Sequence, residues 1–404
     1  MQIRFLRSIL TLGFLGATAA CAALQSGGTI GARSGDIPQT RAHAAASPVG
    51  YLYAVNYNSN TVSQLAFVPG SKPPIVSLGD FSLPSGCTGP DGIQVLPAQN
   101  LAFISCYSGE VLPLNLGKNH ELEASTVAPI PIPSPLQVLV PATGAKGVLY
   151  VDAYPGSVAL LSYGAKRLKL LHSYPTGSVY PAAMSLYTNP HGNSTLFVAA
   201  AYAGVACGSI TGGAILRWSQ NSKGNLTPEA TIPACTTAYD LVALNGKVFW
   251  ASASFFGGFD LVHNKPLKLK TPFAPYQGPG YYPAAMQPLG VVKQAPTSME
   301  PSDAVPGSDF TLDGVTGSVF FMRNGVSIGA VDIAKRVASL TDCKAFFPKI
   351  KLNGIEYGEI CFSIVGDTLV VQGLQRNFKT GEVAKTSLGS LPIAEVFAGA
   401  GEFR

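Results

Sequence analysis

The sequence predicts an all-β protein that folds as a β-propeller of seven four-stranded blades, with six or eight blades as the alternatives. Three observations lead to this prediction: short β-rich runs recur about every fifty residues, Gly, Pro and Asn bound them, and aromatic and β-branched residues are plentiful. The chain has 404 residues, with 44 Gly, 31 Pro and only 12% charged residues. This composition excludes a coiled coil or a helical solenoid, which need Ala, Glu, Lys and Leu.

Residues 1–20 have the pattern of a secretory signal peptide. Arg4 and Arg7 form a short basic region, an apolar stretch follows, and small residues lead up to Cys21. The apolar stretch is too short for a membrane span, which needs about 20 residues. We therefore expect an exported protein.

The end of this segment, Ala19-Ala20-Cys21, resembles a bacterial lipoprotein box. In that family the cysteine becomes the N-terminus and is diacylated, which implies lipidation of Cys21. The alternative is an ordinary cleavage site nearby, with Cys21 incidental. Residues 21–48 are rich in Ala, Ser and Gly and predict a flexible tether. The expected location is a bacterial membrane, reached through the lipid, or the periplasmic or extracellular space.

The six remaining cysteines fall into three local pairs. An exported protein meets an oxidising compartment, in which such pairs form disulfides. Among the possible pairings we favour the local one, because the repeat places both members of each pair at the same end of a blade. The predicted disulfides are Cys87–Cys106, Cys207–Cys235 and Cys343–Cys361. There is no Cys-x-x-Cys, so we expect no structural zinc.

The repeat is clearest in its second strands. Each is a β-rich run followed by a turn and a further apolar run, which is a hairpin signal. We identify them at 51–57, 101–107, 148–154, 196–202, 248–255, 319–322 and 369–371. A repeated motif supports the period, since Tyr180-Pro-Ala-Ala-Met184 recurs two periods later as Tyr282-Pro-Ala-Ala-Met286.

The first hairpin resembles the YVTN-type propeller repeat. Leu52-Tyr53-Ala54-Val55-Asn56 and the later Asn60-Thr61-Val62-Ser63 match that repeat. Its relatives include the NHL and lactonase-type propellers. The resemblance therefore implies a propeller fold and, for the calcium-dependent lactonases, acidic ligands around the central channel.

Residues 49–404 are expected to form a single propeller domain with two irregular parts. The first hairpin lacks an innermost strand before it, and we expect residues 392–397 to supply one. Residues 272–309, rich in Pro and Tyr, break the period as an insertion. Long loops are often functional, so we interpret the insertion as a cap on the propeller mouth, with a packed decoration as the alternative.

Three acids mark a candidate cation site. Asp91 and Asp240 come just before presumed inner strands, and Asp152 ends a second strand. In a propeller these positions gather at one face around the channel, where carboxylates suit a hard cation. The alternative is turn capping, in which Asp hydrogen-bonds its own backbone.

Recurring aromatics mark a candidate ligand surface. Five second strands end in an aromatic residue in constant register, namely Tyr57, Tyr107, Tyr154, Tyr202 and Phe255. At one face these side chains would form a partial ring that suits sugars, peptides or a partner surface. The alternative is packing between adjacent blades.

The sequence gives little support for a serine hydrolase, a nucleic-acid-binding protein or a cofactor-dependent enzyme. Gly325-Val-Ser-Ile-Gly329 matches the hydrolase nucleophile elbow, but that motif needs a later catalytic His, and the last one is His263. The net charge of +5 comes without a dense basic face, so we expect no nucleic-acid partner. No cofactor is expected, and the membrane is reached only through an N-terminal lipid.

Two functions remain open. The first is a non-catalytic binding or scaffold protein at the cell envelope, with an envelope protein or a glycan as partner. The alternative is an exported propeller enzyme, such as a lactonase, another hydrolase or a lyase, with a divalent cation such as Ca²⁺ in the central channel. Because catalytic constellations are scarce, the sequence favours the first.

Overall fold

The structure is a computed structural model. It describes residues 50–56, 60–68, 75–141, 144–177, 180–207, 210–234, 240–244, 246–251, 256–267, 287–288, 298–299, 318–323, 327–332, 337–346, 355–365, 368–377 and 387–402. The predicted signal peptide and tether lie outside these ranges. Within them, no helix has both the length and the apolar character that crossing a membrane requires.

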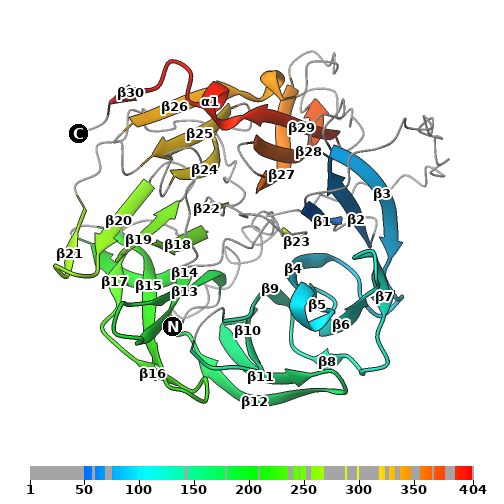
Figure 1. The fold of residues 1–404 in the computed structure, drawn as a ribbon. Helices are drawn as coiled ribbons and strands as arrows, with labels where there is room; N and C mark the ends of the chain where they lie inside the picture. Colours follow the sequence, from blue (N-terminus) through cyan, green and yellow to red (C-terminus); the bar gives the residue numbers. More distant parts are fainter. Residues whose placement is uncertain are drawn as a thin grey trace, which may run out of the picture.

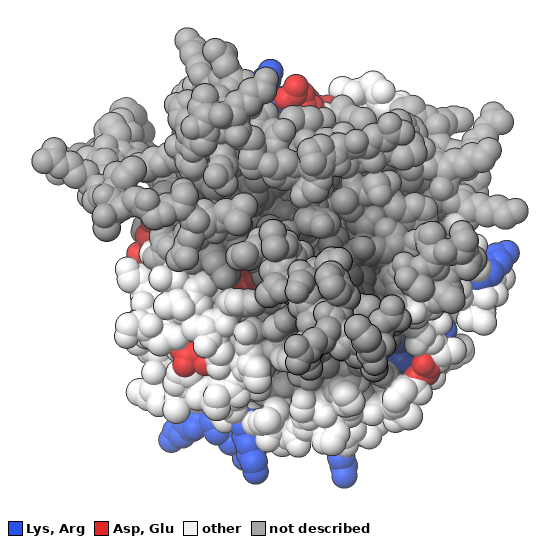
Figure 2. Space-filling model, turned by 180° about the vertical axis from the view of Figure 1, so that it is seen from behind, with Lys and Arg blue, Asp and Glu red and all other residues white. Residues whose placement is uncertain are grey.

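The described strands form seven sheets arranged in a ring around a centre (Figure 1). Within each sheet, neighbouring strands pair antiparallel, with the exception of the parallel pair β23 and β1. We call the strand nearest the centre of the ring the innermost strand of its sheet. This arrangement is a β-propeller, so the predicted fold class is confirmed. Seen from behind, Lys and Arg gather at the rim of the ring, and the described part of this face is mostly uncharged (Figure 2).

The first four sheets are built from strands between residues 50 and 233, with β23 added to the first, and we number the sheets in chain order. The first contains β23 (Ser298–Met299), β1 (Gly50–Asn56), β2 (Thr61–Phe67) and β3 (Ile75–Ser82). The second contains β4 (Pro90–Leu96), β5 (Leu101–Cys106), β6 (Glu110–Leu116) and β7 (Leu122–Ala124), with β8 (Ile130–Pro131) beside β6. The third contains β9 (Pro135–Leu139), β10 (Val148–Ala153), β11 (Ser157–Gly164) and β12 (Arg167–Pro175). The fourth contains β13 (Pro181–Thr188), β14 (Ser194–Cys207), β15 (Ile210–Gln220) and β16 (Leu226–Pro228), with β17 (Ile232–Pro233) beside β15.

The remaining sheets complete the ring. The fifth contains β18 (Asp240–Leu244), β19 (Lys247–Ala251), β20 (Phe256–Asp260) and β21 (Lys265–Pro266). The sixth contains β22 (Gln287–Pro288), β24 (Ser318–Arg323), β25 (Ser327–Asp332), β26 (Val337–Asp342) and β30 (Gly401–Glu402). The seventh contains β27 (Ile355–Val365), β28 (Thr368–Asn377) and β29 (Ser387–Pro392). Short helices are two 3-10 turns, Pro97–Gln99 and Cys343–Ala345, and α1 (Ile393–Val396).

Each of the seven predicted second strands stands second in its sheet, as β1, β5, β10, β14, β19, β24 and β28. The repeated Tyr-Pro-Ala-Ala-Met motif also follows this order. Its first copy opens β13, the innermost strand of the fourth sheet, and its second copy directly precedes β22, the innermost strand of the sixth. The period read from the sequence is therefore the period of the sheets.

Second strands such as β5 are mostly apolar because they pack against the sheets on both sides. In β5, Leu101 and Phe103 join a core shared with the third sheet, whereas Ala102 and Ile104 join a core shared with the first. Successive side chains of a strand point to opposite faces, so an unbroken apolar run fills both spaces. Burying one such large side chain contributes about 1.5–3 kcal/mol.

The predicted origin of the innermost strand of the first sheet is wrong. That strand is β23, whose Ser298 and Met299 pair parallel with β1. Residues 392–397 instead end β29 and form α1, in which Ile393 and Val396 are both buried. Apolar residues three positions apart share a face in a helix but lie on opposite faces in a strand, which explains the helical turn.

Of the predicted insertion at 272–309, the structure describes only β22 and β23. Each occupies the innermost position of a sheet, the sixth and the first respectively. The interpretation of the remaining insertion as a cap concerns residues outside the described ranges.

Polar side chains of the inner strands link consecutive sheets. In each case an oxygen of one inner strand accepts a hydrogen bond from a backbone N–H in or just after the next. We call these the inter-sheet links: Gln94 Oε1 with Val140 N at 3.1 Å, Gln137 Oε1 with Met184 N at 2.5 Å, and Ser185 Oγ with Ala243 N at 3.0 Å. They position the inner ends of the second to fifth sheets relative to one another.

Candidate functional site

Asp91 and Asp152 lie at the same end of two neighbouring sheets. Asp91 is the second residue of β4, whose first residue, Pro90, pairs with Cys106 at the end of β5. Asp152 is the penultimate residue of β10, whose last residue, Ala153, pairs with Pro135 at the start of β9. Antiparallel pairing therefore brings the start of each inner strand and the end of each second strand together.

A close approach of backbones joins the two sheets at this end. The register of β4 against β5 shifts between Pro90 and Gly92, so Asp91 sits at a bulge. A Cβ atom on Gly92 would lie 2.9 Å from the carbonyl oxygen of Leu136, a distance that a real side chain does not tolerate. Ser105 Oγ fills the junction, donating to that oxygen at 2.5 Å and accepting from Gly92 N at 2.7 Å.

The Asp152 carboxyl is fully buried and only half satisfied. Its Oδ1 accepts a hydrogen bond from Gln137 N at 2.5 Å, whereas its Oδ2 has no hydrogen-bond partner in the described structure. Burial raises the pKa of Asp152 well above its ordinary value, and the Asp91 charge adds to the increase, while the Gln137 N–H opposes it. An unpartnered buried oxygen of this kind costs free energy that a bound donor would recover.

Asp91 as a whole residue is only partly buried. Loss of hydration in the surrounding protein raises the pKa of Asp91 to about 7. Near neutral pH this carboxyl therefore exchanges readily between its protonated and its charged form, the property needed of a group that takes up or releases a proton.

Two tyrosines and a serine complete the cluster. Tyr107 and Tyr154 directly follow β5 and β10, and both are half-buried. Burial raises the pKa of Tyr107, the neighbouring Tyr154 and Asp91 raise it further, and a hydrogen bond with the Ser134 side chain opposes them. Tyr154 N donates to Ser134 O at 3.1 Å, so Ser134 connects the two turns.

We call Asp91, Asp152, Tyr107, Tyr154 and Ser134 the acid–tyrosine cluster. It combines two carboxyls, two phenols and a hydroxyl. No Lys or Arg is among the groups that shift the pKa of its two aspartates in the described structure. The cluster can therefore accept hydrogen bonds from a cationic ligand, hold a cation between its carboxyls, or exchange a proton.

The other predicted site residues are placed only in part. Tyr202 lies within β14, where pairing with β15 is interrupted between Ala200 and Val205, and Asp240 opens β18. The side chains of both lie outside the described structure, as do Tyr57, Phe255 and the proposed lipidation site Cys21. The structure thus brings together Asp91, Asp152, Tyr107 and Tyr154 and leaves the rest as predictions.

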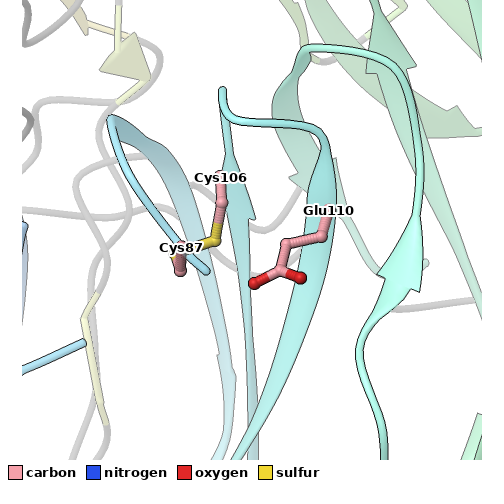
Figure 3. Close-up of side chains that lie close together, drawn as sticks. All are labelled: Cys87, Cys106 and Glu110. Atoms are coloured by element: carbon pink, nitrogen blue, oxygen red, sulfur yellow. A yellow bond between two sulfur atoms is a disulfide. The ribbon is translucent and has the colours of Figure 1, made fainter. Parts of the chain in front are cut away.

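The predicted Cys87–Cys106 disulfide is present next to this end of the second sheet (Figure 3). Glu110 lies beside it, close enough for the three side chains to resemble a metal cluster by distance alone. The sulfurs are bonded to each other and not available as thiolates, so we assign the group a structural role. The disulfides predicted for Cys207–Cys235 and Cys343–Cys361 concern side chains outside the described structure.

Sequence reasoning missed Gln137, whose backbone N–H holds Asp152 while its side chain forms an inter-sheet link. A signal was present, because Gln94-Val95-Leu96 recurs as Gln137-Val138-Leu139 in the next inner strand. It also missed Ser134, which carries no pattern in the sequence.

No protein-family model matches the chain, and no curated protein is similar to it in sequence. Among solved structures, it is similar to one described as dihydro-heme d1 dehydrogenase NirN in complex with DHE. The TM-score is 0.44 and the identity 12%, over 88% of this chain and 78% of that chain. A likeness of this size carries no argument about function. The sheets and the cluster themselves define the class of protein: a β-propeller with an acidic, tyrosine-flanked site at one end of its ring.

Proposed function

We propose that the protein is an exported, lipid-anchored β-propeller that binds an envelope protein or glycan without catalysing a reaction. The observation that supports this most is the half-exposure of Tyr107 and Tyr154 beside two acids. Packing between sheets, the alternative role for these aromatics, is carried out by a different set of fully buried rings: Tyr53, Phe103, Tyr150, Phe197 and Phe249. Half-exposed tyrosines that the core does not use are suited to ligand contact.

The anchor is tested by detergent phase partitioning. We expect the full chain expressed in a bacterium to enter the detergent phase and the Cys21→Ala variant to stay in the aqueous phase. Equal partitioning of both would remove the lipid anchor from the proposal.

The binding role is tested separately from the anchor. The Cys21→Ala chain is mixed with washed bacterial envelopes and pelleted. We expect it to co-sediment, and a version with Tyr107→Ala and Tyr154→Ala to remain in the supernatant. Tyr187→Ala is the matched control, because Tyr187 lies at the opposite end of β13 and packs against a neighbouring core. If the double variant still pellets, the cluster is not the binding surface.

A propeller enzyme with a divalent cation is the second candidate, because the structure brings Asp91 and Asp152 close enough to affect one another. Under this alternative Asp240 would be a further ligand. Calorimetric titration with Ca²⁺, Mg²⁺ and Zn²⁺ tests it. A saturable site that is lost in both Asp91→Asn and Asp240→Asn would favour the enzyme and justify a screen of lactone and ester substrates.

A further inference from the structure

We propose that the acid–tyrosine cluster binds a primary ammonium group, with Asp152 and Asp91 as acceptors and the rings of Tyr107 and Tyr154 beside it. This inference rests on the proposed binding function and names the chemistry that the site would recognise. The ligand is a molecule that carries a free amine, such as an amino sugar or a lysine side chain.

The first argument is the unmet acceptor. Asp152 has 0% of its surface exposed, and Oδ2 has no hydrogen-bond partner in the described structure, although Oδ1 is bound by Gln137 N. Native proteins rarely leave a buried polar atom in this state, and such an atom points to a missing donor. An ammonium group carries three N–H donors and no acceptor, so it fits a site composed of acceptors.

The second argument is charge. Asp91 and Asp152 lie near one another, and the two ion pairs found among the described residues, Arg217–Glu229 and His263–Asp260, involve neither of them. Burial disfavours the charged form of both carboxyls, and for Asp152 the neighbouring Asp91 adds to this. A cation bound beside them would stabilise the charged form of both, which only accepts hydrogen bonds.

The third argument separates an ammonium group from a metal ion. Calcium takes about six to eight oxygen ligands. Among the described residues the cluster offers two carboxyls, Asp91 and Asp152, and its other members are phenols and a hydroxyl. Two carboxylates with two phenols beside them are a poor metal shell. Aromatic rings, in contrast, attract an ammonium group through their negative faces.

The fourth argument concerns access and excludes a bulkier cation. Asp152 is fully buried, whereas Asp91, Tyr107 and Tyr154 are half-exposed. Of these four acidic and phenolic side chains, Asp91, Tyr107 and Tyr154 are therefore the ones in contact with solvent. A quaternary ammonium has no N–H to donate, so it would leave Asp152 Oδ2 as it is.

The test is calorimetric titration of the full chain at neutral pH. Glucosamine and Nα-acetyl-lysine are the ammonium probes, one for each source of the amine. N-acetylglucosamine is the matched neutral sugar, and tetramethylammonium is the matched cation without donors. We expect saturable binding of at least one ammonium probe and none of either control.

Variants locate the site. We expect Asp91→Asn to weaken binding of the ammonium probe at least ten-fold and Tyr107→Ala to weaken it several-fold. Asp260→Asn removes an acid at the opposite end of a sheet and is expected to bind as the wild type does. Asp91 is partly exposed and Asn has nearly its shape, so a thermal melt of Asp91→Asn should show a folded protein.

Every other outcome overturns the inference. Equal binding of N-acetylglucosamine would show that the site does not recognise the amine. Binding of tetramethylammonium would show that the site does not require N–H donors. Binding of Ca²⁺ in place of any amine, lost in Asp91→Asn, would return the cluster to the metal hypothesis. No binding of any probe, while Tyr107 and Tyr154 remain necessary for envelope co-sedimentation, would refute the ammonium site and leave the binding function standing.

Discussion

The aspartates at the two ends of the sheets have pKa values shifted in opposite directions. Asp260 ends β20 and accepts three hydrogen bonds, from Val262 N at 3.0 Å, His263 N at 2.9 Å and His263 Nδ1 at 2.9 Å. These bonds lower the pKa of Asp260 to about 2, with the two from His263 contributing most. Asp91 and Asp152 lie at the other end of their sheets and have raised pKa values. Burial removes water from these carboxyls, and the surrounding protein offers few hydrogen-bond donors to replace it.

The contrast shows how to separate a structural acid from a functional one in this fold. Turn capping was the alternative interpretation of the three acids predicted to form a cation site. Asp260 shows a completed cap, in which both carboxylate oxygens are bound by residues two or three positions later. Asp152 is held on one oxygen by the neighbouring strand and left open on the other. An acid that caps a turn stabilises the fold, whereas an open one costs stability and is therefore a candidate for a functional role.

The largest expected effect comes from removing the disulfide beside the acid–tyrosine cluster. Cys106 pairs with Pro90, next to Asp91. Replacing Cys87 and Cys106 by Ser should lower the free energy of unfolding by about 3 kcal/mol, because the unfolded chain gains loop freedom. Denaturant unfolding of the oxidised wild type and the variant measures this difference. Because the start of β4 is loosened, the pKa of Asp91 should move back toward its ordinary value, which NMR titration detects; no movement would mean that the disulfide does not hold the cluster.

Asp91→Asn should produce the next largest effect, with a sign that depends on pH. The folded protein holds a proton on Asp91 up to about pH 7, whereas the unfolded chain releases it near pH 3.8. The Asp91 contribution to stability is thus greatest below pH 4, falls as the pH rises to about 7, and is then constant. The Asn variant lacks this loss and should be more stable than the wild type at pH 8, with little difference at pH 4. The full shift corresponds to about 4 kcal/mol, and the partial exposure of Asp91 reduces the expected difference to about 2 kcal/mol.

Unfolding by urea at several pH values measures this prediction. Asp152, Tyr107 and Tyr154 are the neighbouring titratable groups, and all stay in place in the variant. A variant less stable than the wild type at pH 8 would show that Asp91 is a structural acid like Asp260.

Asp260→Asn should have the smallest effect, in the opposite direction. The lowered pKa means that the charged form stabilises the fold above about pH 4 and that this contribution disappears as the pH falls through about 2. The Asn variant should be less stable than the wild type at pH 7, by less than the Asp91 change, and equal to it near pH 2. Thermal melts at the two pH values measure the difference; a gain in stability at pH 7 would contradict the comparison.

The fold could be predicted because its signals are local. A second strand such as Val148–Ala153 is apolar at every position except Asp152 and ends at a turn, and both features appear in the sequence. The position of β23 beside β1 could not be predicted, because that pairing joins segments far apart in the chain and only two residues of each take part. The number of blades stays a prediction.

The site could be predicted in part for the same reason. Asp91, Asp152, Tyr107 and Tyr154 each occupy a fixed place relative to a strand end, so the repeat alone predicts that they share one end of the ring. Whether an acid at such a place is satisfied depends on particular residues beside it, here Gln137 on the adjacent strand β9 and Ser134 just before that strand. The sequence therefore predicts where the acids lie, but not that Asp152 Oδ2 is left without a hydrogen-bond donor.

The inter-sheet links run in one direction around the ring. Gln94, Gln137 and Ser185 each reach forward to the sheet that follows in the chain, and the acceptor is always on the earlier sheet. In each of these three links, the earlier sheet supplies the side chain and the later sheet supplies only a backbone N–H, which every residue except proline has. A duplicated sheet that kept its linking side chain could therefore bond to the sheet after it without a matching substitution there.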